Sequence, residues 1–162
     1  MKKSVCFLCL LLALTLLLVT GCSSTGNGNQ GTGKVDSADA DNTTLGDYTV
    51  EILSCRLAED YEGKPVAIVK YSFTNNSDSA QSFMIAFDDA AFQNGVGLNE
   101  AYFLSESANY SSDNQMKEIK TGATIEVEAA YLLNDNTTDV EIEVSELFSL
   151  DDKVISKTFR IV

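Results

Sequence analysis

Apolar and polar residues alternate with a period of two along most of the chain after Tyr48, which is typical of β-strands that bury one face. In residues 124–133 and 140–145, glutamates occupy several of the intervening positions. The side chains predicted to face a core are Ala67, Val69, Tyr71, Phe73, Ile125, Val127, Ala129, Tyr131, Leu133, Val140, Ile142 and Val144. A sheet with one apolar face buries it against a second layer, so the pattern predicts two packed sheets.

Three local signals refine this pattern. The alternation slips by one position at residues 52–53, which predicts a β-bulge. Asn94-Gly95 predicts a hairpin, because a type I′ turn needs a positive φ at both central residues. Residues 83–87, FMIAF, are predicted to form a strand whose inward side chains are Phe83, Ile85 and Phe87.

Seven or eight short strands, separated by turn signals and with no convincing amphipathic helix, predict an all-β antiparallel sandwich over residues 48–162. The exception is the Ser- and Asn-rich connection 99–118, which contains Tyr102, Phe103 and Tyr110. Long connections without their own structure are uncommon and often functional, so these three aromatic residues are candidates for binding a partner. The alternative is structural: residues 102–104 form one more strand or a plug over the end of the sandwich.

The N-terminal residues 1–21 have the layout of a secretory signal peptide: two lysines, an apolar run and a few small residues. The apolar run, residues 5–19, is shorter than the roughly 20 residues that a membrane span requires, which disfavours a plain transmembrane anchor. Residues 18–22, LVTGC, resemble the bacterial lipobox. The resemblance implies cleavage between Gly21 and Cys22 and attachment of a diacylglyceryl group to Cys22. An ordinary signal peptide is the alternative.

Residues 22–47 are rich in Gly, Ser, Asn and Asp and lack apolar periodicity, which predicts a flexible linker. The stretch 26–34, GNGNQGTGK, matches both a dinucleotide-binding pattern and a phosphate-loop pattern. Such loops require a preceding strand and a following helix, and a phosphate loop requires Ser or Thr where Val35 stands. The matches are therefore interpreted as coincidental, and no nucleotide binding is expected.

The chain carries 24 acidic and 11 basic residues and has a formal net charge of −13. Nucleic-acid binding depends on clustered Lys and Arg, so a nucleic-acid partner is not expected. Anionic lipid headgroups are expected to repel the folded domain, which helps to hold it out from the membrane.

The sequence lacks histidine, which excludes Ser-His-Asp, Cys-His and HExxH catalysis, and neither catalysis nor a cofactor is expected. Cys55, the only cysteine of the predicted domain, is interpreted as a small buried hydrophobic residue. No metal site is predicted. The alternative is calcium held by oxygen ligands of three predicted loops, with residues Asp88, Asp89, Asn134, Asp135, Asn136, Asp139, Asp151 and Asp152.

Residues 66–83, 92–98 and 119–135 resemble an immunoglobulin-like domain family of Gram-positive bacterial lipoproteins, a domain of unknown function. The matching features are the turn at 74–77, the hairpin at 93–95, Gly122 and Tyr131. The resemblance implies an immunoglobulin-like β-sandwich at the cell membrane, lipid-anchored and facing outward. The predicted function is non-catalytic binding of an envelope protein or glycan. The alternative is a passive structural module of the envelope.

Overall fold

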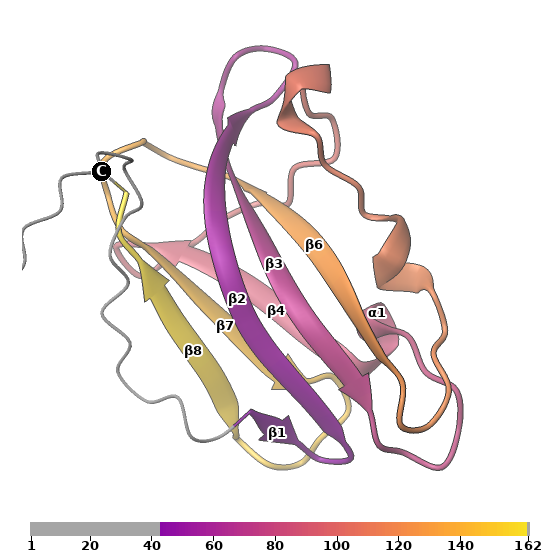
Figure 1. The fold of residues 1–162 in the computed structure, drawn as a ribbon. Helices are drawn as coiled ribbons and strands as arrows, with labels where there is room; N and C mark the ends of the chain where they lie inside the picture. The colour runs from indigo at the N-terminus through magenta and orange to yellow at the C-terminus, as the bar shows by residue number, and fades with distance from the viewer. Residues whose placement is uncertain (1–42, 162) are drawn as a thin grey trace, which may run out of the picture. The chain divides into compact units, whose positions relative to one another are not determined.

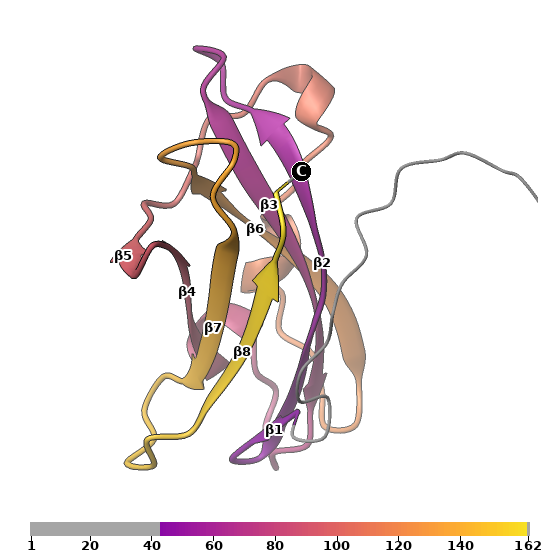
Figure 2. The same cartoon turned by 90° about the vertical axis from the view of Figure 1, so that its left-hand side faces the viewer.

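The computed structural model describes residues 43–161, in which eight β-strands form two antiparallel sheets packed face to face (Figure 1, Figure 2). One sheet has the order β1 (Thr44–Leu45), β2 (Tyr48–Glu59), β3 (Pro65–Asn75) and β6 (Thr124–Leu132). The other has the order β5 (Val96–Gly97), β4 (Phe87–Gln93), β7 (Val140–Glu146) and β8 (Val154–Phe159). With the short β1 left out of the count, this order is that of an immunoglobulin-type sandwich, in which the second strand (β3) pairs with the fifth (β6) and the third (β4) with the sixth (β7). The predicted fold class is confirmed.

The core lies between the sheets and consists of the faces that the period-two pattern selected. Val69, Tyr71 and Phe73 of β3 are fully buried, as are Val140, Ile142 and Val144 of β7. Among the inward positions predicted in β3, β6 and β7, Ile125 is the exception, because it is only partly buried at the margin of the core. The rings of Tyr48, Phe73, Phe83 and Phe87 contact one another at centroid distances between 5.3 and 6.1 Å.

The two predicted irregularities of the strands are present. The pairing of β2 with β3 shifts between Ile52 and Ser54, so that Leu53 forms a bulge. At the turn between β4 and β5, Asn94 has a φ of 51° and Gly95 a φ of 73°, as a type I′ hairpin requires.

The predicted strand at 83–87 is wrong. Residues Phe83–Ala86 form a single helical turn, α1, in which the Ser82 carbonyl accepts hydrogen bonds from the amides of Ile85 and Ala86. Helical spacing turns Phe83 and Ala86 toward the core, whereas Ile85 is 54% exposed. β4 begins immediately afterwards at Phe87, which is buried.

The first strand lies before residue 48, the predicted start of the domain. β1 pairs with β2, and Leu45 is buried in the core. The predicted signal peptide, with Gly21 and Cys22, lies outside the described residues, as does all but the end of the predicted linker. No helix within residues 43–161 is both long enough and apolar enough to cross a membrane.

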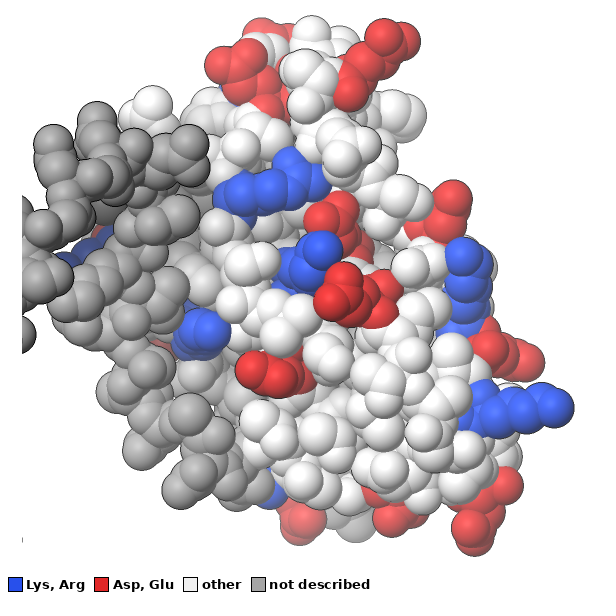
Figure 3. Space-filling model, viewed as in Figure 1, with Lys and Arg blue, Asp and Glu red and all other residues white. Residues whose placement is uncertain are grey.

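Charged residues are unevenly spread over the outer face of the β1-β2-β3-β6 sheet. Figure 3 shows this face with Lys and Arg mostly across its middle and Asp and Glu also at its upper and lower ends. Two exposed ion pairs cross the middle, Lys70 with Glu126 at 3.3 Å and Arg56 with Glu128 at 3.4 Å. The two ends of the sandwich therefore differ from its middle in the balance of acidic and basic side chains.

Candidate functional site

Residues 99–118, which we call the strap, cross the outer face of the β1-β2-β3-β6 sheet. The strap begins beside β6, where the amide of Leu132 donates to the Asn99 carbonyl and the amide of Ala101 donates to the Ala130 carbonyl. It then reaches the connection between β2 and β3, where the amide of Ser105 donates to the Glu59 carbonyl. Two short 3-10 helices follow, η1 (Glu106–Ala108) and η2 (Asp113–Met116).

The strap covers a second, smaller core. β3 is apolar on both faces near its start, so Val66 and Ile68 point away from the main core, together with Ala130 of β6. Ala101 and Ala108 of the strap bury these side chains. The strap therefore belongs to the fold and removes apolar surface from water.

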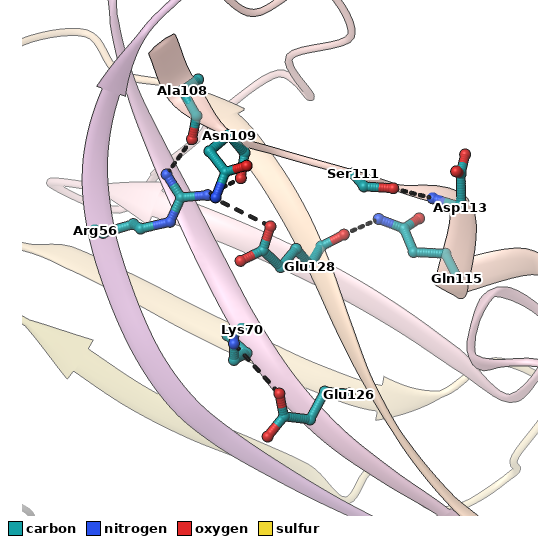
Figure 4. A network of polar contacts seen from close by, with 9 residues as sticks. All are labelled: Arg56, Lys70, Ala108, Asn109, Ser111, Asp113, Gln115, Glu126 and Glu128. Carbon is teal, nitrogen blue, oxygen red and sulfur yellow. Dashed lines mark hydrogen bonds and ion pairs between the residues drawn. The ribbon is translucent and has the colours of Figure 1, made fainter. Parts of the chain in front are cut away.

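Polar side chains fasten the strap to the sheet (Figure 4). The guanidinium group of Arg56 donates to the carbonyls of Ala108 at 2.6 Å and Asn109 at 3.0 Å. The side-chain amides of Asn114 and Gln115 donate to the carbonyls of Glu126 and Glu128. Because β6 is the last strand of its sheet, these amides satisfy backbone groups that would otherwise form an open edge.

Tyr110 is not the exposed contact residue that the sequence suggested. It lies half-buried against the second core, and burial raises the pKa of its hydroxyl. The structural alternative for residues 102–104 is also only partly correct. Leu104 forms a single β-bridge with Asp60, but residues 102–104 form no strand, and the strap covers a sheet face.

Tyr102 and Phe103 are 74% and 73% exposed at the bend of the strap. Phe103 lies beside Tyr61 of the β2–β3 connection, with ring centroids 6.4 Å apart at an angle of 88°. Tyr61 is 70% exposed, and its amide donates to the Phe103 carbonyl. We call Tyr61, Tyr102 and Phe103 the aromatic tip. It is the candidate binding site of the described residues.

Sequence reasoning missed Tyr61, because residues 60–64 are a turn in which one aromatic residue carries no signal of its own. Hydrogen bonds close the turn: the carboxylate of Asp60 accepts from the amides of Glu62 and Lys64, both at 2.8 Å. Gly63 follows with a φ of 79°, a conformation that favours glycine. The turn thereby holds Tyr61 against Phe103.

Carboxylates surround the aromatic tip. The Tyr61 hydroxyl donates to Glu62 at 3.0 Å, and Glu62 also forms an ion pair with Lys64 at 2.5 Å. The hydrogen bonds that Glu62 accepts, first from Lys64 and then from Tyr61, lower the pKa of its carboxyl group. The hydrogen bond that Tyr61 donates to Glu62 raises the pKa of the Tyr61 hydroxyl. The Tyr102 hydroxyl likewise donates to Glu100, which raises its pKa. The site offers aromatic surfaces bordered by hydrogen-bonding groups.

The aromatic tip lies at the end of the sandwich opposite β1 (Figure 1). β2 begins beside β1 and runs for 12 residues before the turn that carries Tyr61. At about 3.3 Å per residue, these 12 residues span about 40 Å. The tip is thus far from the point at which the described chain begins.

In one of the loops considered for calcium, the central carboxylate is occupied by hydrogen bonds within the loop. Asp135 accepts hydrogen bonds from the amides and hydroxyls of Thr137 and Thr138, which lower its pKa to about 2. Within residues 43–161, no group of three or more His, Cys, Asp and Glu side chains could hold a metal ion. Cys55 packs against the core as predicted, and burial raises its thiol pKa to about 11.

Residues 29–146 match the model of a protein family described as "Domain of unknown function (DUF5067)". A comparison with curated proteins finds no match. Two solved structures are similar. A "putative lipoprotein" from Staphylococcus aureus is 18% identical, with a TM-score of 0.55. The match covers 74% of this chain and 92% of the Staphylococcus protein. A protein from Enterococcus faecalis is 21% identical, with a TM-score of 0.54. The match covers 74% of this chain and 88% of the Enterococcus protein. Both likenesses concern the fold.

Proposed function

The chain belongs to the family of domains of unknown function DUF5067, and from this premise we propose that it is a lipid-anchored, non-catalytic protein of the bacterial cell surface. Its sandwich carries the aromatic tip, which binds a protein or glycan of the cell envelope. The binding requires neither a cofactor nor a nucleotide.

Two observations support the anchor. The lipobox-like sequence ending at Cys22 follows an apolar run and precedes a Gly- and Ser-rich linker, which is the order of parts in a bacterial lipoprotein. In addition, the similar solved structure from Staphylococcus aureus is described as a "putative lipoprotein". Two acyl chains hold a protein stably at a membrane, whereas one chain binds only marginally.

The observation that carries the binding role is the contact between the exposed rings of Tyr61 and Phe103, with the exposed Tyr102 adjacent in the chain. Large apolar side chains that stay in water together often mark interaction sites. Tyrosine and phenylalanine provide contact area with little loss of conformational entropy, and their rings stack on sugars as well as on protein side chains. The hydrogen-bonded turn at Asp60 orders Tyr61 before any partner arrives, which lowers the entropic cost of binding.

The anchor is tested by Cys22→Ser in the native host. The wild-type chain is expected to incorporate a fatty-acid probe and to be cut after Gly21, whereas the variant stays uncut and unlabelled. A variant that is labelled as strongly as the wild type would overturn the anchor.

The binding role is tested by capture from native membranes with a Tyr61→Ser/Phe103→Ser double variant. Capture of envelope proteins or glycan fragments is expected to fall at least tenfold, with an unchanged denaturation midpoint. Val96→Ser, which removes another exposed apolar side chain from β5, is the matched control and is expected to capture normally. Equal capture by both variants would favour a passive structural module.

A further inference from the structure

The connection between β7 and β8 carries exposed apolar side chains of its own. Phe148 is 83% exposed, Leu150 is fully exposed and Leu147 is 38% exposed. We call these three residues the apolar loop. Neither of the two apolar cores within residues 43–161 includes them.

The geometry of the connection directs these side chains outward. The amide of Ser149 donates to the Glu146 carbonyl, and the amide of Asp151 donates to the Ser149 hydroxyl. These bonds form a tight turn just beyond the end of β7. The apolar loop is therefore an ordered projection of the sandwich.

The apolar loop lies at the same end of the sandwich as β1 (Figure 1, Figure 2). The ammonium group of Lys153 donates to the Thr44 carbonyl. Gly46 lies so close to the carboxylate of Glu146 that a Cβ there would come within 2.4 Å of an oxygen. The loop is thus beside the point at which residues 1–42 join the described domain.

The length of the preceding segment places a lipid surface within reach. Cys22 precedes Thr43 by 43 − 22 = 21 residues. A linker of the predicted flexible kind and of that length spans about 25 Å on average. Even a weak contact forms readily under these conditions, because tethering to the same membrane raises the effective concentration of the loop at the lipid surface.

We propose that Leu147, Phe148 and Leu150 insert into the interfacial region of the bilayer to which Cys22 anchors the chain. The inference rests on the proposed lipid anchor. Aliphatic side chains leave water in this position, and an aromatic ring suits the boundary between headgroups and acyl chains. The contact orients the domain, so that the aromatic tip at the opposite end of β2 faces away from the membrane.

The neighbouring charges define the kind of lipid surface. Asp151 and Asp152 follow the apolar loop directly, and Glu146 precedes it. Anionic headgroups repel these carboxylates, so insertion is stronger into zwitterionic lipid and weakens as the anionic fraction rises.

The test uses the mature lipidated protein, which begins at Cys22 and therefore lacks Cys6 and Cys9, in phosphatidylcholine vesicles and in a Cys55→Ala background. An environment-sensitive fluorophore is attached at Leu150→Cys or, as control, at Glu106→Cys in η1 near the aromatic tip. The fluorescence emission of the label at position 150 is expected to shift to shorter wavelength. It is also expected to be quenched at least twofold by lipids that carry a spin label near the headgroup. The label at position 106 is expected to behave as in water. Phosphatidylglycerol weakens the signal at position 150, and Asp151→Asn/Asp152→Asn removes that dependence.

Fatty-acid labelling of Cys22 in the same samples separates the two proposals. A labelled, vesicle-bound protein whose probe at position 150 stays in water overturns the membrane contact and leaves the anchor standing. A protein without lipid on Cys22 overturns the anchor and the contact together. A blue shift that grows with the density of protein per vesicle identifies a second copy of the chain as the occupant, and also overturns the membrane contact.

Discussion

The hydroxyl of Tyr131 on β6 donates a hydrogen bond to the carboxylate of Asp89 on β4, and this bond joins the two sheets through the core. The Tyr131 hydroxyl also lies 3.3 Å from that of Tyr71 on β3. Burial raises the pKa of Asp89 and of both tyrosines. The carboxylate of Asp89 is partly buried beside the core, and a carboxylate whose pKa differs between the folded and unfolded states makes the stability of the sandwich depend on pH.

Asp89→Asn is predicted to stabilise the protein at neutral pH. Because the folded state raises the pKa of Asp89, the protonated carboxyl stabilises folding below the unfolded value of about 3.9. This contribution is lost as the pH rises through the folded pKa. Asparagine keeps an acceptor for Tyr131 without the charge. Urea denaturation at pH 4, 5.5 and 7 should show a stability difference that grows with pH, whereas parallel curves would contradict the prediction.

Asp135→Ala is predicted to have the opposite dependence on pH. The amides of Thr137 and Thr138 hold the pKa of Asp135 at about 2, so its contribution is present above the unfolded value and is lost as the pH falls through the folded one. The variant should therefore have a lower Tm than the wild type at pH 7. The deficit should shrink below pH 4, and thermal unfolding monitored by circular dichroism from pH 2 to 7 measures it. A deficit that is constant over this range would mean that the carboxylate charge has no part in it.

The sequence predicted those parts of the fold that depend on local pattern. Period-two alternation identified the buried face of β7, which alternates clearly between the core and the outside. It identified that of β6 as well, although Ala130 of this strand is also buried, on the opposite face. Asn94-Gly95 located a hairpin because its backbone conformation is available to few residues. In contrast, the five residues 83–87 are apolar throughout, and such a short run does not distinguish a strand from a helical turn.

The candidate site was harder to predict, because it depends on contacts between distant segments. Tyr102 and Phe103 were selected from the length of their connection, whereas Tyr61 is brought to Phe103 by contacts between the strap and the β2–β3 connection. The one available signal for the strap was the apolar run 66–69 at the start of β3, which indicates burial on both faces. Such a strand requires a cover, and the strap that covers it also partly buries Tyr110.

Ile142→Ala is predicted to destabilise the protein by about 2–5 kcal/mol, through lost apolar burial and the cavity that remains. Ile142 is fully buried between the two sheets. Its neighbour Glu141 is exposed on the other face of β7, so Glu141→Gln is the matched control and should change the free energy of unfolding by less than about 0.5 kcal/mol. Urea denaturation compares the two variants. Similar losses in both would mean that the register of β7 is misassigned.

The last prediction concerns the edge of the β1-β2-β3-β6 sheet. Asn114→Ala/Gln115→Ala removes the two side-chain amides that bond to the Glu126 and Glu128 carbonyls, at a cost of about 1 kcal/mol for each bond. The freed edge of β6 is then able to pair with another chain. Hydrogen exchange should become faster in residues 111–118, and sedimentation should show concentration-dependent self-association. Asp113→Ala is the control, because its exposed side chain lies in the same 3-10 helix and bonds to neither carbonyl. A double variant that stays monomeric, with unchanged exchange in the strap, would show that the backbone pairing at Asn99 and Ala101 is sufficient to protect the edge.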